Sequence, residues 1–357
     1  MRARTRDRRV YLGSHPLLFA LLAATRRRPA VRLGRTLLVH DRAAFVAGLT
    51  RIPLDRTAAG TTGGAAGRLT GGDLLFDQIG DAHRRARRDT AEALGAAGVA
   101  RLRPTWTGLL DRRLEPLADG GAVDLVPVAA EMAGLTAAAL LEVDVDAVTL
   151  ATAARNAAAA AARAHLPGIR RPGTARAARE ATATLSALLA PDGDDRAALA
   201  TMLAVAAVTT TVAAVPRAVA WACDAGLWAY ADRPALADEL LRVTAPTPLL
   251  PRVAADAGEL PVPGGCPVRA GDRMLLVARH VLDAHRLDPD PVRPAPARIA
   301  QLAFGVGTHA CPGARLARTQ LADVLRALAP YRPVVVRARV DRGAALPSWR
   351  SLVVRAS

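Results

Sequence analysis

The segment Phe304–Gly313, with the sequence FGVGTHACPG, contains the residues of this chain best suited to do chemistry. Gly305 and Gly307 allow the backbone to take positive φ angles and to approach a flat ligand with no Cβ in the way. Cys311 lies just before a predicted helix that starts near Ala314, where free N–H groups and the helix dipole favour a thiolate. The segment therefore marks Cys311 as a candidate thiolate that could bind a metal ion or do chemistry.

Cys311 has no second Cys or His at the spacing of a metal site. The chain has three cysteines and no C-x-x-C pair, which excludes a four-thiolate zinc site and a disulfide scaffold, and favours a reducing compartment. If Cys311 binds a metal, a cofactor must supply the other ligands, and a porphyrin supplies four nitrogens. The alternative is an ordinary buried cysteine beside a glycine turn, but this leaves Phe304, His309 and Gly313 unexplained.

The segment resembles the heme-ligand loop of the cytochrome P-450 superfamily, whose pattern is F-G-x-G-x-H/R-x-C-x-G. The residues at the defined positions all match, and they are Phe304, Gly305, Gly307, His309, Cys311 and Gly313. The resemblance implies a heme b cofactor, with Cys311 as the proximal iron ligand and His309 as a partner of a heme propionate. It also implies that Phe304, Gly305 and Gly313 belong to the cofactor site.

Glu239 and Arg242 are three residues apart, which places a carboxylate and a guanidinium on one face of a predicted helix. By itself such an E-x-x-R sequence usually marks a solvated ion pair. Here it stands about 70 residues before Cys311, as the E-x-x-R motif of the superfamily does. The resemblance implies a brace beneath the heme that Arg293 completes, and it implies that Arg252 reaches a heme propionate.

His83 and Arg87 are four residues apart and point the same way from one helix. Two such donors suit the carboxylates of a bound cofactor, because bonds from Arg can be bidentate. The sequence FDQIGDAH leading to them also resembles the superfamily. The alternative is a solvated basic face, which is our interpretation of Arg84, Arg85 and Arg88, and such a face would suit an acidic redox partner.

The apolar stretch Ala197–Trp228 predicts a long central helix that is kinked at Pro216. In the superfamily this helix carries an acid and an alcohol, usually written A-G-x-D/E-T, which deliver protons. This chain has no Asp or Glu between Arg196 and Ala222, and the groove glycine is also replaced. The missing acid separates this chain from the usual pattern.

Two alignments of the central helix are open. An ungapped alignment puts Ala207 and Val208 at the acid and alcohol positions, and a shift of two residues puts Thr209 and Thr210 there. We expect Thr210 to be the catalytic alcohol, with Thr209 and Thr211 as alternatives.

The resemblance covers roughly residues 70–330 and implies a mainly α cytochrome P-450 fold with a minor β region, shorter than most members. We expect one domain over residues 1–357, with the first 30 or so residues open to disorder. Short segments between Leu250 and Met274, divided by Gly and Pro, predict β-hairpins. Other helices are predicted at Leu75–Leu94, Ala151–Ala164, Arg176–Ala190, Ala235–Val243 and Ala314–Leu328.

The composition limits the class of protein. Apolar residues make up 51% of the chain, which allows a sizeable core and excludes disorder as the main state. The 48 basic residues are all Arg and outnumber 32 acidic ones, so the surface should attract acidic partners. Aromatic residues are only 3% and the Arg is spread along the chain, so we expect no nucleic-acid binding.

Two apolar stretches have some features of a signal peptide or of a membrane-spanning helix. Pro16–Ala24 follows a basic start as in a signal peptide, but Arg26, Arg27 and Arg28 stand where a small-residue cleavage site is expected. Ala197–Pro216 is long enough to cross a bilayer, but Ala, Val and Thr insert weakly. We therefore expect a cytoplasmic protein without a membrane anchor.

These observations together predict a heme-thiolate monooxygenase that oxidises a small organic substrate with O2 and electrons from an acidic ferredoxin-type partner. The chain is rich in Ala, Arg, Gly and Pro and has no Lys, which is typical of a gene rich in G and C. This composition is compatible with a tailoring role in secondary metabolism. An alternative is an atypical heme-thiolate enzyme that uses peroxide or rearranges its substrate without oxidation, because the acid of the central helix is missing. Another is a heme-binding protein without turnover. The substrate itself is not identified by any motif.

Overall fold

The structure is a computed structural model that describes residues 2–61, 64, 87–88, 90–165, 172–190 and 197–357. Most of this part of the chain is helical, as the sequence predicts. The earlier helices are α1 (Arg2–Ser14), α2 (Pro16–Thr25), α3 (Arg42–Thr50), α6 (Ala96–Leu114), α7 (Leu125–Leu141), α8 (Ala147–His165) and α9 (Thr174–Leu189). The later ones are α10 (Ala197–Ala225), α11 (Pro234–Thr244), α12 (Ala278–Val281), α13 (Ala297–Ala300) and α14 (Ala314–Leu328).

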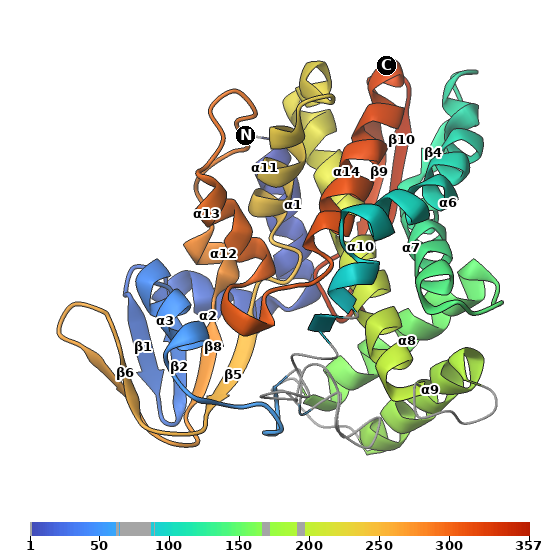
Figure 1. Ribbon diagram of the computed structural model, residues 1–357. Coiled ribbons are helices and arrows are strands. Elements are labelled where there is room, and N and C mark those ends of the chain that lie inside the picture. Colours follow the sequence, from blue (N-terminus) through green and yellow to red (C-terminus); the bar gives the residue numbers. More distant parts are fainter. Residues whose placement is uncertain (1, 62–63, 65–86, 89, 166–171, 191–196) are drawn as a thin grey trace.

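The helix α10 is the centre of the larger core and packs against α1, α7, α8, α9, α11 and α14 (Figure 1). Its second half is buried almost continuously from Val212 to Ala222. It continues through Pro216 and ends where Gly226 takes a left-handed conformation with φ 66°. It is also the one described helix long and apolar enough to cross a membrane, and 44% of its most apolar stretch is buried inside the protein.

The strands form three small sheets, and the largest is at one end of the molecule, apart from the helices around α10 (Figure 1). Its order is β1 (Ala30–Leu33), β2 (Thr36–Val39), β8 (Arg273–Leu276), β5 (Leu250–Ala254), β3 (Leu54–Asp55). The second sheet contains β4 (Ala122–Asp124), β10 (Trp349–Arg355) and β9 (Val334–Val340). A hairpin is formed by β6 (Gly258–Leu260) and β7 (Cys266–Val268).

The hairpins predicted between Leu250 and Met274 correspond to β5 and β8, which belong to the largest sheet, and to the separate hairpin β6–β7. The early hairpin β1–β2 joins the largest sheet, because β2 pairs in parallel with β8, and β3 pairs with β5. These pairings bury Leu37, Leu276 and neighbouring side chains in a second core. This second core lies against the short 3₁₀ helix η3 (Gln301–Phe304), which leads into the cysteine segment.

The first residues of the chain, which the sequence left open to disorder, form α1 and α2. The Asp7 carboxylate of α1 accepts hydrogen bonds from Arg217 at 2.6 Å and from Arg279 at 3.2 Å. The Tyr11 ring lies between the same two guanidinium groups, at 4.5 Å and 3.8 Å from its centroid. Because Asp7 and Arg217 are almost fully buried, α1 is tied to the second half of α10 by a buried ion pair.

The other helix predictions are confirmed within a few residues. Ala151–Ala164, Arg176–Ala190 and Ala235–Val243 correspond to α8, α9 and α11, and α14 has the predicted bounds. The predicted helix Leu75–Leu94 lies mostly outside the described residues.

Candidate functional site

The backbone of the cysteine segment is set by two glycines. Gly305 ends η3 with φ 72°, and Gly307 begins the short 3₁₀ helix η4 (Gly307–His309) with φ 79°. A Cβ at Gly307 would also lie 3.1 Å from the Thr50 side chain of α3, so this position is both strained and tight for other residues. The Cys311 N–H donates a 2.8 Å hydrogen bond to the Phe304 carbonyl, which closes the segment into a loop.

Cys311 is exposed and lies two residues before Gly313, the N-cap of α14. Exclusion of water by the surrounding protein raises the pKa of the Cys311 thiol. A hydrogen bond from the Gly313 N–H and the charges of Arg87 and Arg318 act in the opposite direction and do not outweigh it. The predicted preference for a thiolate is therefore not produced by the helix start alone. A bound metal ion would supply the missing stabilisation, since metals bind the deprotonated form of cysteine.

Two cations lie beside this loop. Arg87 Nη2 donates a 2.5 Å hydrogen bond to the carbonyl of Ala310, the residue before the cysteine. The Arg318 guanidinium of α14 lies 4.5 Å from the centroid of the Phe304 ring and its Nε is 2.5 Å from an Asp238 carboxylate oxygen of α11. Arg318 was not predicted as a site residue, although its position one turn into the predicted helix was a usable signal.

Arg252, in β5, has the properties expected of a carboxylate-binding residue. Its Nη1 donates to the Pro251 carbonyl at 2.8 Å, whereas its Nε is buried and has no hydrogen-bond partner among the described residues. Burial, followed by the charge of Arg56, lowers the pKa of Arg252 to about 10. A buried guanidinium with a free N–H is costly unless an anion pairs with it.

The Glu239–Arg242 pair of α11 is buried, with 2% of each side chain exposed. Two hydrogen bonds of 2.8 Å and 2.6 Å join the guanidinium to the carboxylate. Arg242 also donates to the carbonyls of Leu282 and Asp288, each at 3.0 Å. The pair is therefore a buried brace between α11 and the irregular segment after α12 and not a surface contact, while its place beneath a heme stays a prediction.

The prediction that Arg293 completes this brace is wrong. Its side chain is 88% exposed and its Nε is 3.3 Å from a carboxylate oxygen of Asp290. The remaining hydrogen-bonding capacity of Glu239 is filled by the backbone N–H groups of Asp290 and Ala295, each at 3.0 Å. Because backbone groups complete the brace, a second arginine is not needed.

On α10, burial distinguishes the two alignments of the central helix. Val208 is fully buried in the core, whereas Thr209 and Thr210 are partly exposed. This favours the shifted alignment, with Thr209 at the acid position and Thr210 at the alcohol position. Thr210 Oγ1 donates to the Ala206 carbonyl at 2.7 Å, and its oxygen lone pairs stay available to accept a hydrogen bond.

Two predicted cofactor residues are not tested by the structure. His83 lies outside the described residues. The backbone of His309 lies in η4, but its side chain is also outside the description.

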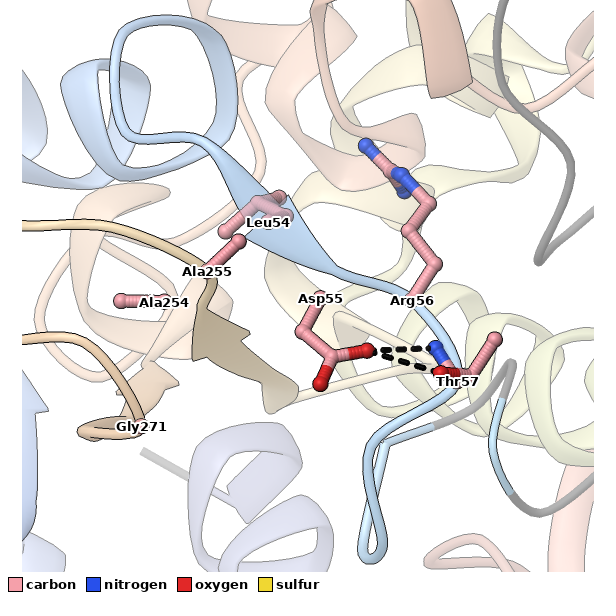
Figure 2. Close-up of a pocket in the computed structure, with 7 residues that line it drawn as sticks. All are labelled: Leu54, Asp55, Arg56, Thr57, Ala254, Ala255 and Gly271. Atoms are coloured by element: carbon pink, nitrogen blue, oxygen red, sulfur yellow. Dashed lines mark hydrogen bonds between the residues drawn. The ribbon is translucent and has the colours of Figure 1, made fainter.

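A pocket of about 410 Å³ lies where β3 meets β5 (Figure 2). It is lined by Leu54, Asp55, Arg56, Thr57, Ala254, Ala255 and Gly271. Asp55 accepts hydrogen bonds from the backbone N–H and the hydroxyl of Thr57, at 3.0 Å and 2.9 Å. Figure 2 shows Arg56 extending away from that carboxylate. Arg56 is a further residue that the sequence analysis missed.

The described residues fit the heme that the sequence predicts. They provide a cysteine at the start of α14, a loop in which Gly305 and Gly307 take positive φ angles, and a buried N–H without a partner in Arg252. A porphyrin with two carboxylates would use all three features.

Solved structures with the same fold cover nearly the whole chain. P450BioI, solved with acyl carrier protein bearing hexadec-9Z-enoic acid, has a TM-score of 0.75 and 17% identity, over 97% of this chain and 99% of its own. CYP164A2 from Mycobacterium smegmatis has a TM-score of 0.72 and 23% identity, over 96% of this chain and 100% of its own. P450 OxyD, involved in the biosynthesis of vancomycin-type antibiotics, has a TM-score of 0.71 and 19% identity, over 97% of each chain.

No protein-family model matches this chain, and none of the curated proteins matches it. The identities of the structural matches are low, so their similarity establishes the architecture and not the reaction. That architecture is the one implied by the segment around Cys311 and by Glu239 and Arg242. The chain has the cytochrome P450 fold.

Proposed function

We propose that this protein is a heme-thiolate oxidoreductase that oxidises a small organic substrate. The observation that carries the proposal is the loop around Cys311, closed by the hydrogen bond from its N–H to Phe304 and placed at the start of α14. In a P450 fold, this loop is where a heme iron would take its cysteine ligand. When bound, a heme with a thiolate ligand supplies the activation of dioxygen or peroxide for substrate oxidation.

The residues around Cys311 have separable roles in this proposal. The Gly313 N–H and the positive charges of Arg87 and Arg318 stabilise a thiolate, since each lowers the pKa of the sulfur. Arg252, whose Nε is free, is proposed as a partner of a propionate, and His83 and His309 are proposed as further propionate partners. Phe304 belongs to the loop through its carbonyl, which accepts from the Cys311 N–H, and its ring lies against the Arg318 guanidinium.

The brace and the loop are connected through α11. Glu239 and Arg242 fix α11 to the segment after α12, and Asp238, next to Glu239, pairs with Arg318 of α14. The position of α14, and with it the position of Cys311, therefore depends on the brace. We expect loss of the brace to misplace the ligand and not merely to lower stability.

Proton delivery is the unusual feature of the site. In the favoured alignment Thr210 offers a hydroxyl to substrate or water, and Thr209 stands where a carboxylate is usual. A hydroxyl with a pKa far from neutral cannot carry a proton as a carboxylate does. Proton supply must then come through ordered water or through the substrate itself.

The proposed role in secondary metabolism is supported by a structural neighbour. OxyD is involved in the biosynthesis of vancomycin-type antibiotics, so the same architecture is used in secondary metabolism there. For this chain we propose a comparable tailoring oxidation in the cytoplasm, with electrons from an acidic ferredoxin-type protein. The net charge of +16 supports an acidic partner, because opposite charges accelerate association.

A second candidate function is supported by the absence of a carboxylate between Ala197 and Ala222 of α10. An enzyme driven by peroxide receives protons together with its oxidant, and a rearrangement without oxidation needs none. Turnover measured with a reduced ferredoxin system, with peroxide, and with neither tests the two candidates. Turnover only with the reduced ferredoxin supports the first proposal, turnover with peroxide or with no addition supports the second, and no turnover with a heme-loaded protein would contradict both.

A further inference from the structure

Arg56 and Arg252 lie at the end of the β3–β5 pair. The antiparallel register joins Leu54 to Ala254 and Asp55 to Val253, and Arg56 and Arg252 are the next residues along the two chains, one step beyond the last pair. Continued by one residue, this register brings the two side chains to the same face of the sheet, and the charge of Arg56 acts on Arg252. Like charges in this arrangement destabilise a sheet unless something neutralises them.

No carboxylate of the described residues forms an ion pair with either arginine. Asp55 is the acidic residue nearest in sequence, but it accepts its hydrogen bonds from Thr57, and Figure 2 shows it turned away from Arg56. The Nε of Arg252 is buried without a partner, and Arg56 is half-buried with no side-chain hydrogen bond to a described residue. Exclusion of water lowers the pKa of both groups, and the charge of Arg56 adds to the effect on Arg252.

Two partly desolvated guanidinium groups on one face form a site for an anion. Each guanidinium has a planar set of N–H donors that matches a carboxylate, and Arg252 has one such donor unused. We propose that Arg56 and Arg252 together bind one carboxylate group, which makes Arg56 a binding residue that no motif of the chain marks. The inference rests on the proposed function only in placing this pair beside the heme.

The carboxylate can come from two sources, a heme propionate or the substrate. Both present the same planar anion to the pair, so the structure identifies the chemistry of the group and the experiment identifies its source. The test compares Arg56→Gln, which keeps polarity and removes the charge, with Arg56→Lys, which keeps the charge and loses the planar set of donors. Arg51→Gln is the matched control, because Arg51 is an exposed arginine five residues earlier that forms no ion pair with a described residue.

The first arm measures heme retention of the heme-loaded protein, as the rate of heme transfer to an excess of apomyoglobin. If the pair holds a propionate, Arg56→Gln should accelerate heme loss on the order of tenfold, because a charge-assisted hydrogen bond is lost. Arg56→Lys should lie between wild type and Arg56→Gln, and Arg51→Gln should match wild type. Thermal unfolding checks that each variant is folded.

The second arm titrates the heme-loaded ferric protein with decanoate and with decanamide, its neutral counterpart, and records the shift of the Soret band. If the pair holds a substrate carboxylate, Arg56→Gln should weaken decanoate binding about tenfold and leave decanamide binding unchanged. If Arg56→Gln matches Arg51→Gln in both arms, the proposal is wrong. If the wild type does not bind heme through its thiolate, the proposed function fails separately, and calorimetric titration of the same variants with decanoate and decanamide then decides the carboxylate site alone.

Discussion

The Arg87 guanidinium donates a 2.5 Å hydrogen bond to the carbonyl of Ala310, although the two residues are 223 positions apart in the chain. This contact holds the residue next to Cys311 and brings a positive charge to the sulfur. A guanidinium has five N–H donors, so Arg87 can hold this carbonyl and still bind a heme carboxylate. The residue therefore connects the shape of the loop to the retention of the cofactor.

Replacing Arg87 by Ala should weaken heme retention, because the variant loses both the contact with Ala310 and a donor to a propionate. Each charge-assisted hydrogen bond of this kind contributes about 1.5–3 kcal/mol. Heme occupancy after extensive dilution measures the effect, and Arg88→Ala is the control, since Arg88 is the exposed neighbour on the same helix. Full occupancy of the Arg87→Ala protein under dilution would show that Arg87 is only a loop contact.

Replacing Glu239 by Ala should leave Arg242 as an unpaired buried cation. Removal of one partner from a buried ion pair typically costs about 3–5 kcal/mol, so we expect mostly insoluble or heme-free protein. Glu180→Ala is the matched control, because the Arg176–Glu180 pair has 79% and 61% of its side chains exposed and should contribute little. A soluble, heme-loaded Glu239→Ala protein with unchanged thermal stability would contradict the structural role of the brace.

Several elements were predictable because local signals specify them. The bounds of α14 follow from its apolar stripe and from Gly313 before it, and the Glu239–Arg242 contact follows from spacing on one helix. The loop at Cys311 was predictable because an ordinary buried cysteine beside a turn does not account for its whole pattern of residues.

The elements that were missed depend on contacts between distant parts of the chain. β2 is specified by its parallel pairing with β8, more than 200 residues later, and four-residue strands carry almost no periodic signal of their own. The position of Arg293 could not be derived from sequence, because backbone N–H groups took the place assigned to its side chain. Arg56 becomes notable only when the pairing of β3 with β5 brings it near Arg252.

The buried histidines His40 and His280 should make the protein sensitive to acid. Their Nδ1 atoms are 2.8 Å apart, so at least one ring must be neutral. Burial lowers the pKa of His280 to about 3, and the charges of His40, His285, Arg279 and Arg26 add to this effect. Burial and the charge of His285 lower the pKa of His40 to about 4. In the unfolded chain both groups titrate near 6.5.

The unfolded state therefore binds more protons than the folded state between about pH 6.5 and pH 3–4. The contribution of the two neutral histidines to the free energy of unfolding is complete above pH 6.5. It is lost as the pH falls through this window, by up to roughly 1.4 kcal/mol per pH unit for each histidine. Urea unfolding at several pH values measures the slope. His280→Asn should make the free energy of unfolding less dependent on pH in this window, and an unchanged slope would exclude the histidine pair as its cause.

The shifted alignment of α10 predicts opposite effects for two neighbouring threonines. Thr210→Ala should impair turnover of the native substrate, because the hydroxyl proposed to take part in proton delivery is lost. Thr209→Asp should increase the fraction of reductant used for product with a surrogate substrate, because it restores an acid at the usual position. The measurement is the ratio of product and hydrogen peroxide to reductant consumed. Tight coupling in the wild type with simple surrogates would mean that another route supplies protons.

The central claim is that Cys311 is the thiolate ligand of a heme iron, and the absorption spectrum of the reduced protein with carbon monoxide tests it most directly. The wild type should show the long-wavelength Soret band typical of a thiolate ligand. Cys311→Ser should lose that band, because a neutral hydroxyl is a poor iron ligand, whereas Cys266→Ser, which changes a partly buried cysteine of β7, should retain it. A thiolate band that persists in Cys311→Ser, or its absence from the heme-loaded wild type, would contradict the account.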